Sequence, residues 1–155
     1  MFKINKVDEK FLKASKEHII IHNHIQLFQD LLAKESTDEW RHLLQQALGP
    51  FESDIRAHFE LEEQVLFPAA LTCLSSLEIC DMVLKFQKEH GYFEKDLMML
   101  QSRLSTETDE DLRAFLEQFL KQFREHALAE TQQLYYLMDR EKACQRLIKG
   151  IIIPA

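Results

Sequence analysis

The chain has 155 residues, of which 46% are hydrophobic, and a formal net charge of −7 at pH 7. This length predicts one domain with a core of its own. No basic cluster stands out, which argues against a nucleic-acid partner. There is no apolar run of about 18 residues and no apolar signal core near Met1, so we expect neither a membrane span nor a targeting segment.

Glycine, proline and cysteine usage narrows the fold class and the compartment. Three glycines and three prolines favour helices with short connections over a many-turned β architecture. The cysteines are odd in number and lack Cys-x-x-Cys spacing: Cys73, Cys80 and Cys144. We therefore expect free thiols and a reducing cytoplasm.

Capping residues predict four helices in a single domain over residues 1–155. The expected helices span residues 8–34, 37–71, 76–103 and 109–149, with a short apolar tail at 151–155. Their starts carry N-capping signals: Asp8, the capping boxes Ser36 to Glu39 and Ser75 to Glu78, and Thr108 or Asp109. Gly49-Pro50 predicts a break in the second helix. The fold class is therefore all-α, an antiparallel up-down-up-down four-helix bundle.

Each predicted helix has an apolar stripe in three- and four-residue steps, as a bundle seam requires. The stripes are interrupted by polar residues at the same few positions: His18, His58, Glu62, His90, His126, Glu130 and, in addition, Gln133. A His-x-x-x-Glu pair occurs twice, and residues four apart lie on one helix face. A Lys-Glu-His triplet precedes each pair, ending at His18 and at His90.

The spacing places the four histidines at one level of the bundle. His90 and His126 are centred on residue 108, and His18 and His58 on residue 38, close to the two expected turns. Buried carboxylates are costly unless they are paired or bind metal, and two of them together repel. A pair of metal ions removes both problems, and imidazole with carboxylate suits iron, manganese and zinc.

Other side chains compete for places in this cluster. On the first helix His22 lies one turn beyond His18 and is an added or alternative ligand, and His24 ranks third. Glu94, one turn after His90, could reach the same site as a ligand; otherwise it is a solvated residue or an outer hydrogen-bond acceptor. Glu63 is expected to point elsewhere, and His42 is expected at the surface.

The stretch from His58 to Pro68, HFELEEQVLFP, resembles the second-helix motif of the hemerythrin-like, or HHE cation-binding, family. His126-x-x-x-Glu130 is similar to the fourth-helix motif of its bacterial members, and Glu-His at 17–18 and 89–90 resembles the remaining ligand positions. The resemblance covers about residues 8–140. It implies a di-iron centre bridged by oxo or hydroxo oxygen, with Glu62 and Glu130 bridging the irons and the four histidines as terminal ligands. Zinc or manganese is a possible substitute for iron.

Two departures from the invertebrate oxygen carriers argue against simple reversible O₂ carriage. Those carriers have a second histidine on the third helix where this chain has Glu94. They also have an aspartate five residues after the fourth-helix histidine, whereas Glu130 follows His126 at four. We expect a cytoplasmic metal-binding protein that binds or senses O₂, NO or iron, rather than an enzyme. The alternatives are a di-iron redox enzyme, such as an oxidase, a peroxidase-like enzyme or a nitrosyl repair factor, and a metal-stabilised interaction module.

Overall fold

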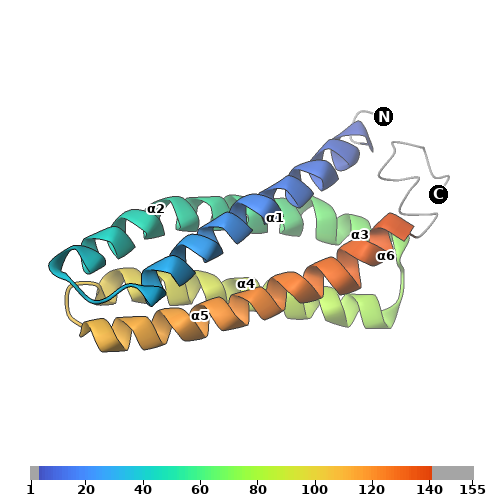
Figure 1. Cartoon of the computed structure of the whole chain (residues 1–155). Helices are drawn as coiled ribbons and strands as arrows, with labels where there is room; N and C mark the ends of the chain where they lie inside the picture. The colour runs from blue at the N-terminus through green and yellow to red at the C-terminus, as the bar shows by residue number, and fades with distance from the viewer. Residues whose placement is uncertain (1–3, 141–155) are drawn as a thin grey trace.

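Four helical rods form an antiparallel bundle in the computed structural model, which describes residues 4–140 (Figure 1). The elements are α1 (Ile4–Ala33), α2 (Asp38–Leu61), η1 (Glu62–Leu66), α3 (Phe67–Cys73), α4 (Leu77–Arg103), α5 (Asp109–Ala129), η2 (Glu130–Tyr135) and α6 (Tyr136–Arg140). Here η1 and η2 are π-helical turns that join α2 to α3 and α5 to α6, so these segments make single rods. Contacts join α1 to α2, α2 to α4, α4 to α5 and α5 to α1, which closes the bundle. Within the described residues the fold is all-α, as expected.

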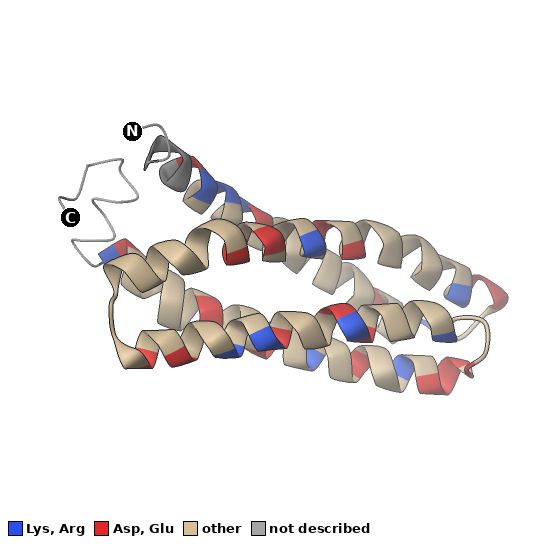
Figure 2. Ribbon diagram, turned by 180° about the vertical axis from the view of Figure 1, so that it is seen from behind, with Lys and Arg blue, Asp and Glu red and all other residues tan. Residues whose placement is uncertain are grey.

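Basic and acidic residues are interspersed along the helices, with neither charge gathered on one rod (Figure 2). In the described part of the chain, no helix is both long and apolar enough to cross a membrane. The expected tail at 151–155 and the end of the predicted fourth helix lie outside the described residues.

The helix starts differ from the expected caps at Asp8 and at Ser75. The first helix already runs at Ile4, so the prediction that Asp8 caps it is wrong, because no residue after Ile4 stops helix propagation. Ser76 rather than Ser75 caps α4, and its Oγ accepts from the Ile79 N–H at 3.1 Å. Thr108, one of the two caps expected for the last helix, caps α5 in the same way, because its Oγ1 accepts from the Asp111 N–H.

The predicted capping box from Ser36 to Glu39 does not form. Thr37 is the N-cap of α2 and makes no side-chain cap bond. The Ser36 hydroxyl accepts instead from Arg113 Nε of α5 at 3.0 Å. A tertiary contact has therefore replaced the local cap.

The predicted break at Gly49-Pro50 is also wrong, because α2 runs unbroken through Pro50. Gly49 and Pro50 are both exposed, so the carbonyl that loses its N–H partner to proline lies on the solvent side, where water satisfies it. The helical irregularity occurs later in this rod, at η1.

Each π-helical turn begins at a glutamate of the predicted site. The Phe67 N–H bonds Glu62 O, and the Tyr136 N–H bonds Thr131 O, both at i to i−5. The inserted residue rotates the following side chains by about one position. As a result Gln133, expected on the seam, is exposed, and Leu134, Tyr135 and Met138 are buried instead.

Two apolar clusters fill the bundle on either side of the polar positions. The cluster nearer the α1–α2 and α4–α5 loops contains Phe28, Trp40, Phe51, Phe119 and Phe123. The cluster at the other end contains Leu66, Phe67, Phe86, Leu134 and Met138. Burying these side chains supplies the main stabilisation, and the polar residues lie between the two clusters.

Two arginines hold the loops at the first end. Arg113 of α5 donates to the carbonyls of Leu32 and Lys34 and lies over the Trp40 ring, 4.1 Å from its centroid. Arg41 of α2 donates to the carbonyls of Leu104 and Glu107 in the opposite loop. These bonds satisfy helix C-terminal carbonyls and fix the register of the two helix pairs.

The expectation that the cysteines are free thiols is wrong for Cys73. Cys73 is disulfide-bonded, whereas Cys80 is free and half-buried. Cys144 lies outside the described residues.

Candidate metal centre

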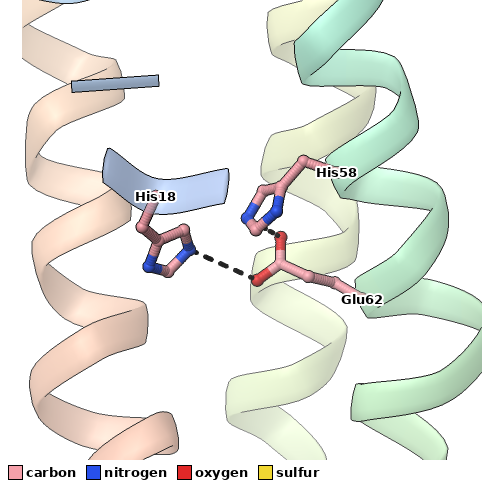
Figure 3. A group of neighbouring side chains, drawn as sticks. All are labelled: His18, His58 and Glu62. Atoms are coloured by element: carbon pink, nitrogen blue, oxygen red, sulfur yellow. Dashed lines mark ion pairs between the residues drawn. The ribbon is translucent and has the colours of Figure 1, made fainter. Parts of the chain in front are cut away.

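The bundle brings six predicted site residues together between the two apolar clusters. They form two groups of ligand-type atoms, each within 4.8 Å of one another: His18, His58 and Glu62, and His90, His126 and Glu130. The first group belongs to α1 and the α2 rod, and the second to α4 and the α5 rod. Figure 3 shows the His18 and His58 rings directed toward the Glu62 carboxylate.

In the first group the Glu62 carboxylate faces both imidazoles. His58 Nε2 lies 3.2 Å from Glu62 Oε1, and His18 Nε2 lies 4.0 Å from Glu62 Oε2. The four-residue helical spacing puts His58 beside Glu62, as the sequence predicts.

In the second group His126 Nε2 lies 2.9 Å from Glu130 Oε1. His90 connects the two groups, because its Nε2 is 3.4 Å from Glu62 Oε1 and 3.5 Å from Glu130 Oε2. The two carboxylates therefore share the same imidazole, and the groups form one continuous polar centre.

The centre is almost fully enclosed, with its metal-facing atoms left without hydrogen bonds. His58, Glu62, His90, His126 and Glu130 are at most 3% exposed. Six buried atoms of the described residues have no hydrogen-bond partner: Nε2 of all four histidines, Glu62 Oε1 and Glu130 Oε2. Buried polar atoms are normally paired, so this convergent set of atoms without hydrogen-bond partners is suited to binding a cation.

The outer nitrogens of three of the histidines are held by carboxylates. His58 Nδ1 lies 2.9 Å from Glu17 Oε2, and His90 Nδ1 lies 3.1 Å from Glu63 Oε1. His126 Nδ1 lies 3.3 Å from Glu89 Oε1. With the proton on Nδ1, each Nε2 presents a lone pair to the centre, and carboxylate partners of this kind orient metal-binding histidines and raise their basicity.

These outer contacts form a closed ring around the bundle. On each rod, a residue next to a site residue in the sequence contacts the site histidine of the following rod. Glu17 contacts His58, Glu63 contacts His90, Glu89 contacts His126, and Thr131 contacts His18. The last contact is Thr131 Oγ1 with His18 Nδ1 at 3.5 Å. This arrangement explains why a glutamate precedes both His18 and His90, and it shows that the expectation for Glu63 is wrong.

The protonation of the centre follows from its burial. Burial raises the pKa of Glu62, but His90 and His58 oppose this and hold it well below its usual range. Burial and the Glu62 charge raise the pKa of Glu130 well above its usual value. Burial lowers the pKa of His90, yet Glu130 and Glu62 outweigh it and bring it to about 9. The His90 imidazole is therefore protonated at neutral pH in the metal-free centre, where its charge offsets that of Glu62.

The pKa values of two further site histidines, His18 and His126, are lowered. Burial and His58 bring the pKa of His18 to about 4, and burial lowers the pKa of His126. Both rings are therefore neutral at physiological pH, the state in which imidazole binds metal.

Tyr135 is a site residue that the sequence analysis missed. Its hydroxyl donates to Glu62 Oε2 at 2.7 Å, and its ring stacks on His18 with centroids 4.8 Å apart. Burial and the charge of Glu62 raise the pKa of this phenol well above its ordinary value, so it stays protonated. The signal in the sequence is an aromatic residue five positions after each site glutamate, at Phe67 and Tyr135.

The alternative ligands lie outside both groups. His24 Nε2 contacts Asp54 Oδ2 at 2.7 Å instead. His22 is exposed and lines a groove beside the centre. Glu94 lines a shallow hollow on α4 with Gly91 and Lys95, and His42 is exposed as expected.

Two cavities border the centre, and residues of α5 line both. A groove of about 240 Å³ between α1, α2 and α5 is lined by His18, His58 and Glu130 and by mainly apolar side chains such as Ile21, Phe59 and Leu128. A more polar cavity of about 390 Å³ between α4 and α5 touches His126 and Glu89. Residues of both groups therefore line cavities.

A family model of the hemerythrin HHE cation binding domain matches residues 15–138. The chain belongs to this family. The match covers most of the sequence and includes all six residues of the two groups, and it bears out the resemblance drawn from the second-helix motif. No curated protein and no solved structure matches the chain. The family and the geometry agree on a cation-binding bundle.

The donor set suits transition-metal cations. Four imidazole nitrogens and two carboxylates suit iron, manganese or zinc, whereas calcium and magnesium prefer all-oxygen sites. The partnerless Nε2 and carboxylate oxygens are the atoms that such ions require as ligands.

Proposed function

We propose that the protein binds two metal ions, one at each His-His-Glu group, with Glu62 and Glu130 shared between them. The observation that supports this most directly is the convergence of six buried ligand atoms that lack hydrogen-bond partners. His90 lies within 3.5 Å of both carboxylates, which favours one coupled pair over two separate sites. We propose iron as the metal, because the donor set suits it and because the chain belongs to the hemerythrin HHE family.

We further propose that the metal pair binds a small diatomic ligand, O₂ or NO, and acts as a sensor or binding protein. Iron held by the two groups would supply the redox chemistry suited to such a ligand. The chain's own residues keep the centre dry: Phe59 stacks on His90 with centroids 3.7 Å apart, and Phe93 lies against His126. The groove beside His18 and His58 has mainly apolar walls, which suits an uncharged ligand better than an anion.

The test is anaerobic reconstitution with Fe(II), followed by titration with NO and, separately, with O₂. The proposal requires about two irons per chain and saturable binding of at most one or two diatomic molecules per centre. The Glu62→Gln/Glu130→Gln double variant should bind neither NO nor O₂. The His42→Ala variant should bind both gases as the wild type does. Iron binding without any response to NO or O₂ would leave a metal-stabilised module and refute ligand binding.

A further inference from the structure

The two halves of the chain carry the same local arrangement after each site glutamate. Glu62 opens η1 and Phe67 follows it, while Glu130 opens η2 and Tyr135 follows it. In both rods the π-helical turn directs the aromatic residue inward, and both rings are buried.

Each of these rings stacks on a site histidine of another rod. The Phe67 ring lies 5.5 Å from the His90 ring with an interplanar angle of 24°. The Tyr135 ring lies 4.8 Å from the His18 ring with an angle of 15°. Phe67 and Tyr135 therefore pack in the same way against a site histidine, and their side chains differ by one hydroxyl group.

That hydroxyl makes a single contact to the centre. Tyr135 donates to Glu62 Oε2 at 2.7 Å, in a fully buried hydrogen bond. The other oxygen, Oε1, is left facing His58 and His90. In the described part of the chain, Glu130 receives no hydroxyl hydrogen bond, because Phe67 occupies the corresponding position.

We propose that Tyr135 is a positioning residue of the centre, whose hydroxyl fixes the Glu62 carboxylate so that Oε1 points at the metal site and the His18–His58–Glu62 group is preorganised. This inference rests on the proposed metal binding. A carboxylate held by one oxygen cannot rotate freely, so less ordering is lost when metal binds. Since Glu130 lacks this restraint, the two groups are inequivalent in affinity.

The expected effect of Tyr135→Phe is a 10–100-fold weaker binding at the His18–His58–Glu62 group, the usual range for loss of an outer hydrogen bond to a ligand. The second group should weaken by a smaller factor, because only the shared Glu62 carboxylate is loosened while His90, His126 and Glu130 keep their contacts. Tyr136 provides the matched control: it is the next residue, it is exposed, and its hydroxyl contacts Arg140 rather than the centre.

The experiment is a Co(II) titration of metal-free protein, followed by the visible absorption of bound cobalt, in the wild type, Tyr135→Phe and Tyr136→Phe. His18→Ala and His126→Ala variants assign each binding step to a group. Tyr135→Phe should weaken the step that His18→Ala abolishes and alter its cobalt spectrum, and Tyr136→Phe should match the wild type. Phe67→Tyr, which offers Glu130 a hydroxyl, should tighten the other step in the Tyr135→Phe background.

The possible failures are distinguishable. If the wild type binds no cobalt, the proposed function fails and this inference fails with it. If the wild type binds two ions but Tyr135→Phe leaves both steps and the spectrum unchanged, Tyr135 has no positioning role while metal binding stands. Equal weakening of both steps together with a lower unfolding temperature of the metal-free protein would make Tyr135 a packing residue only, which also overturns the proposal.

Discussion

Loading metal-free protein with Fe(II) under anaerobic conditions should raise its thermal unfolding temperature by at least about 12 °C. The cause lies in the six ligand atoms of the described chain that are buried without hydrogen-bond partners. Leaving one such atom unsatisfied costs about 1–3 kcal/mol. Coordination relieves this cost only in the folded chain, because the ligands are dispersed in the unfolded one.

The size of the expected rise follows from the lower end of this cost, about 1 kcal/mol per unsatisfied atom. Six atoms at about 1 kcal/mol each contribute roughly 6 kcal/mol to the free energy of unfolding. For a domain of this size, 1 kcal/mol corresponds to about 2–4 °C in unfolding temperature. The rise should therefore be no smaller than about 12 °C, and it should grow with free metal concentration, as linkage requires.

Differential scanning calorimetry with and without Fe(II), and after chelation, measures this shift. The rise should be lost in Glu62→Gln/Glu130→Gln, which removes both shared carboxylates. It should persist in His42→Ala, because His42 is exposed and outside the centre. A rise below about 4 °C in the wild type, or one of equal size in the double variant, would refute the reasoning.

Three further outcomes are expected. Metal binding should release protons, because the pKa of His90 is about 9 and that of Glu130 lies well above its usual value. The apparent metal affinity should therefore rise with pH up to about 9. Calorimetry of metal binding in buffers of different ionisation heat would detect the released protons. Glu89→Gln should weaken metal binding 10–100-fold, because Glu89 orients the His126 imidazole. Glu117→Gln makes the same charge change at an exposed position and should leave metal affinity unchanged. Competition with a chromophoric chelator measures the affinity of both variants. Arg113→Met should lower the unfolding temperature by about 4–8 °C, from roughly 2 kcal/mol of lost hydrogen bonds, without changing metal stoichiometry, and unchanged stability would contradict this.

The bundle and the cluster of ligand-type residues could be predicted from periodicity and spacing. Glycine scarcity and the apolar stripes indicated four helices, and the midpoints near residues 38 and 108 placed the histidines at one level. The i, i+4 pairs identify their own helix faces, so His58 with Glu62 and His126 with Glu130 needed no knowledge of the fold.

The parts that the sequence analysis missed depend on contacts between rods or on helix irregularity. Glu63 was expected to point elsewhere because a regular α-helix turns it about 100° from Glu62, yet it reaches His90 on the neighbouring rod. The π-helical turn after Glu130 exposes Gln133 and buries Tyr135, and periodicity of 3.6 residues cannot reveal that shift. Ser36 resembles a local cap but bonds Arg113, a partner that local sequence does not identify.

The most direct test of the central claim is the iron content of the anaerobically purified protein, with an absorption spectrum taken before and after exposure to air. The account predicts about two irons per chain and new near-ultraviolet and visible bands on exposure. A colourless protein that holds no iron even after reconstitution would contradict it.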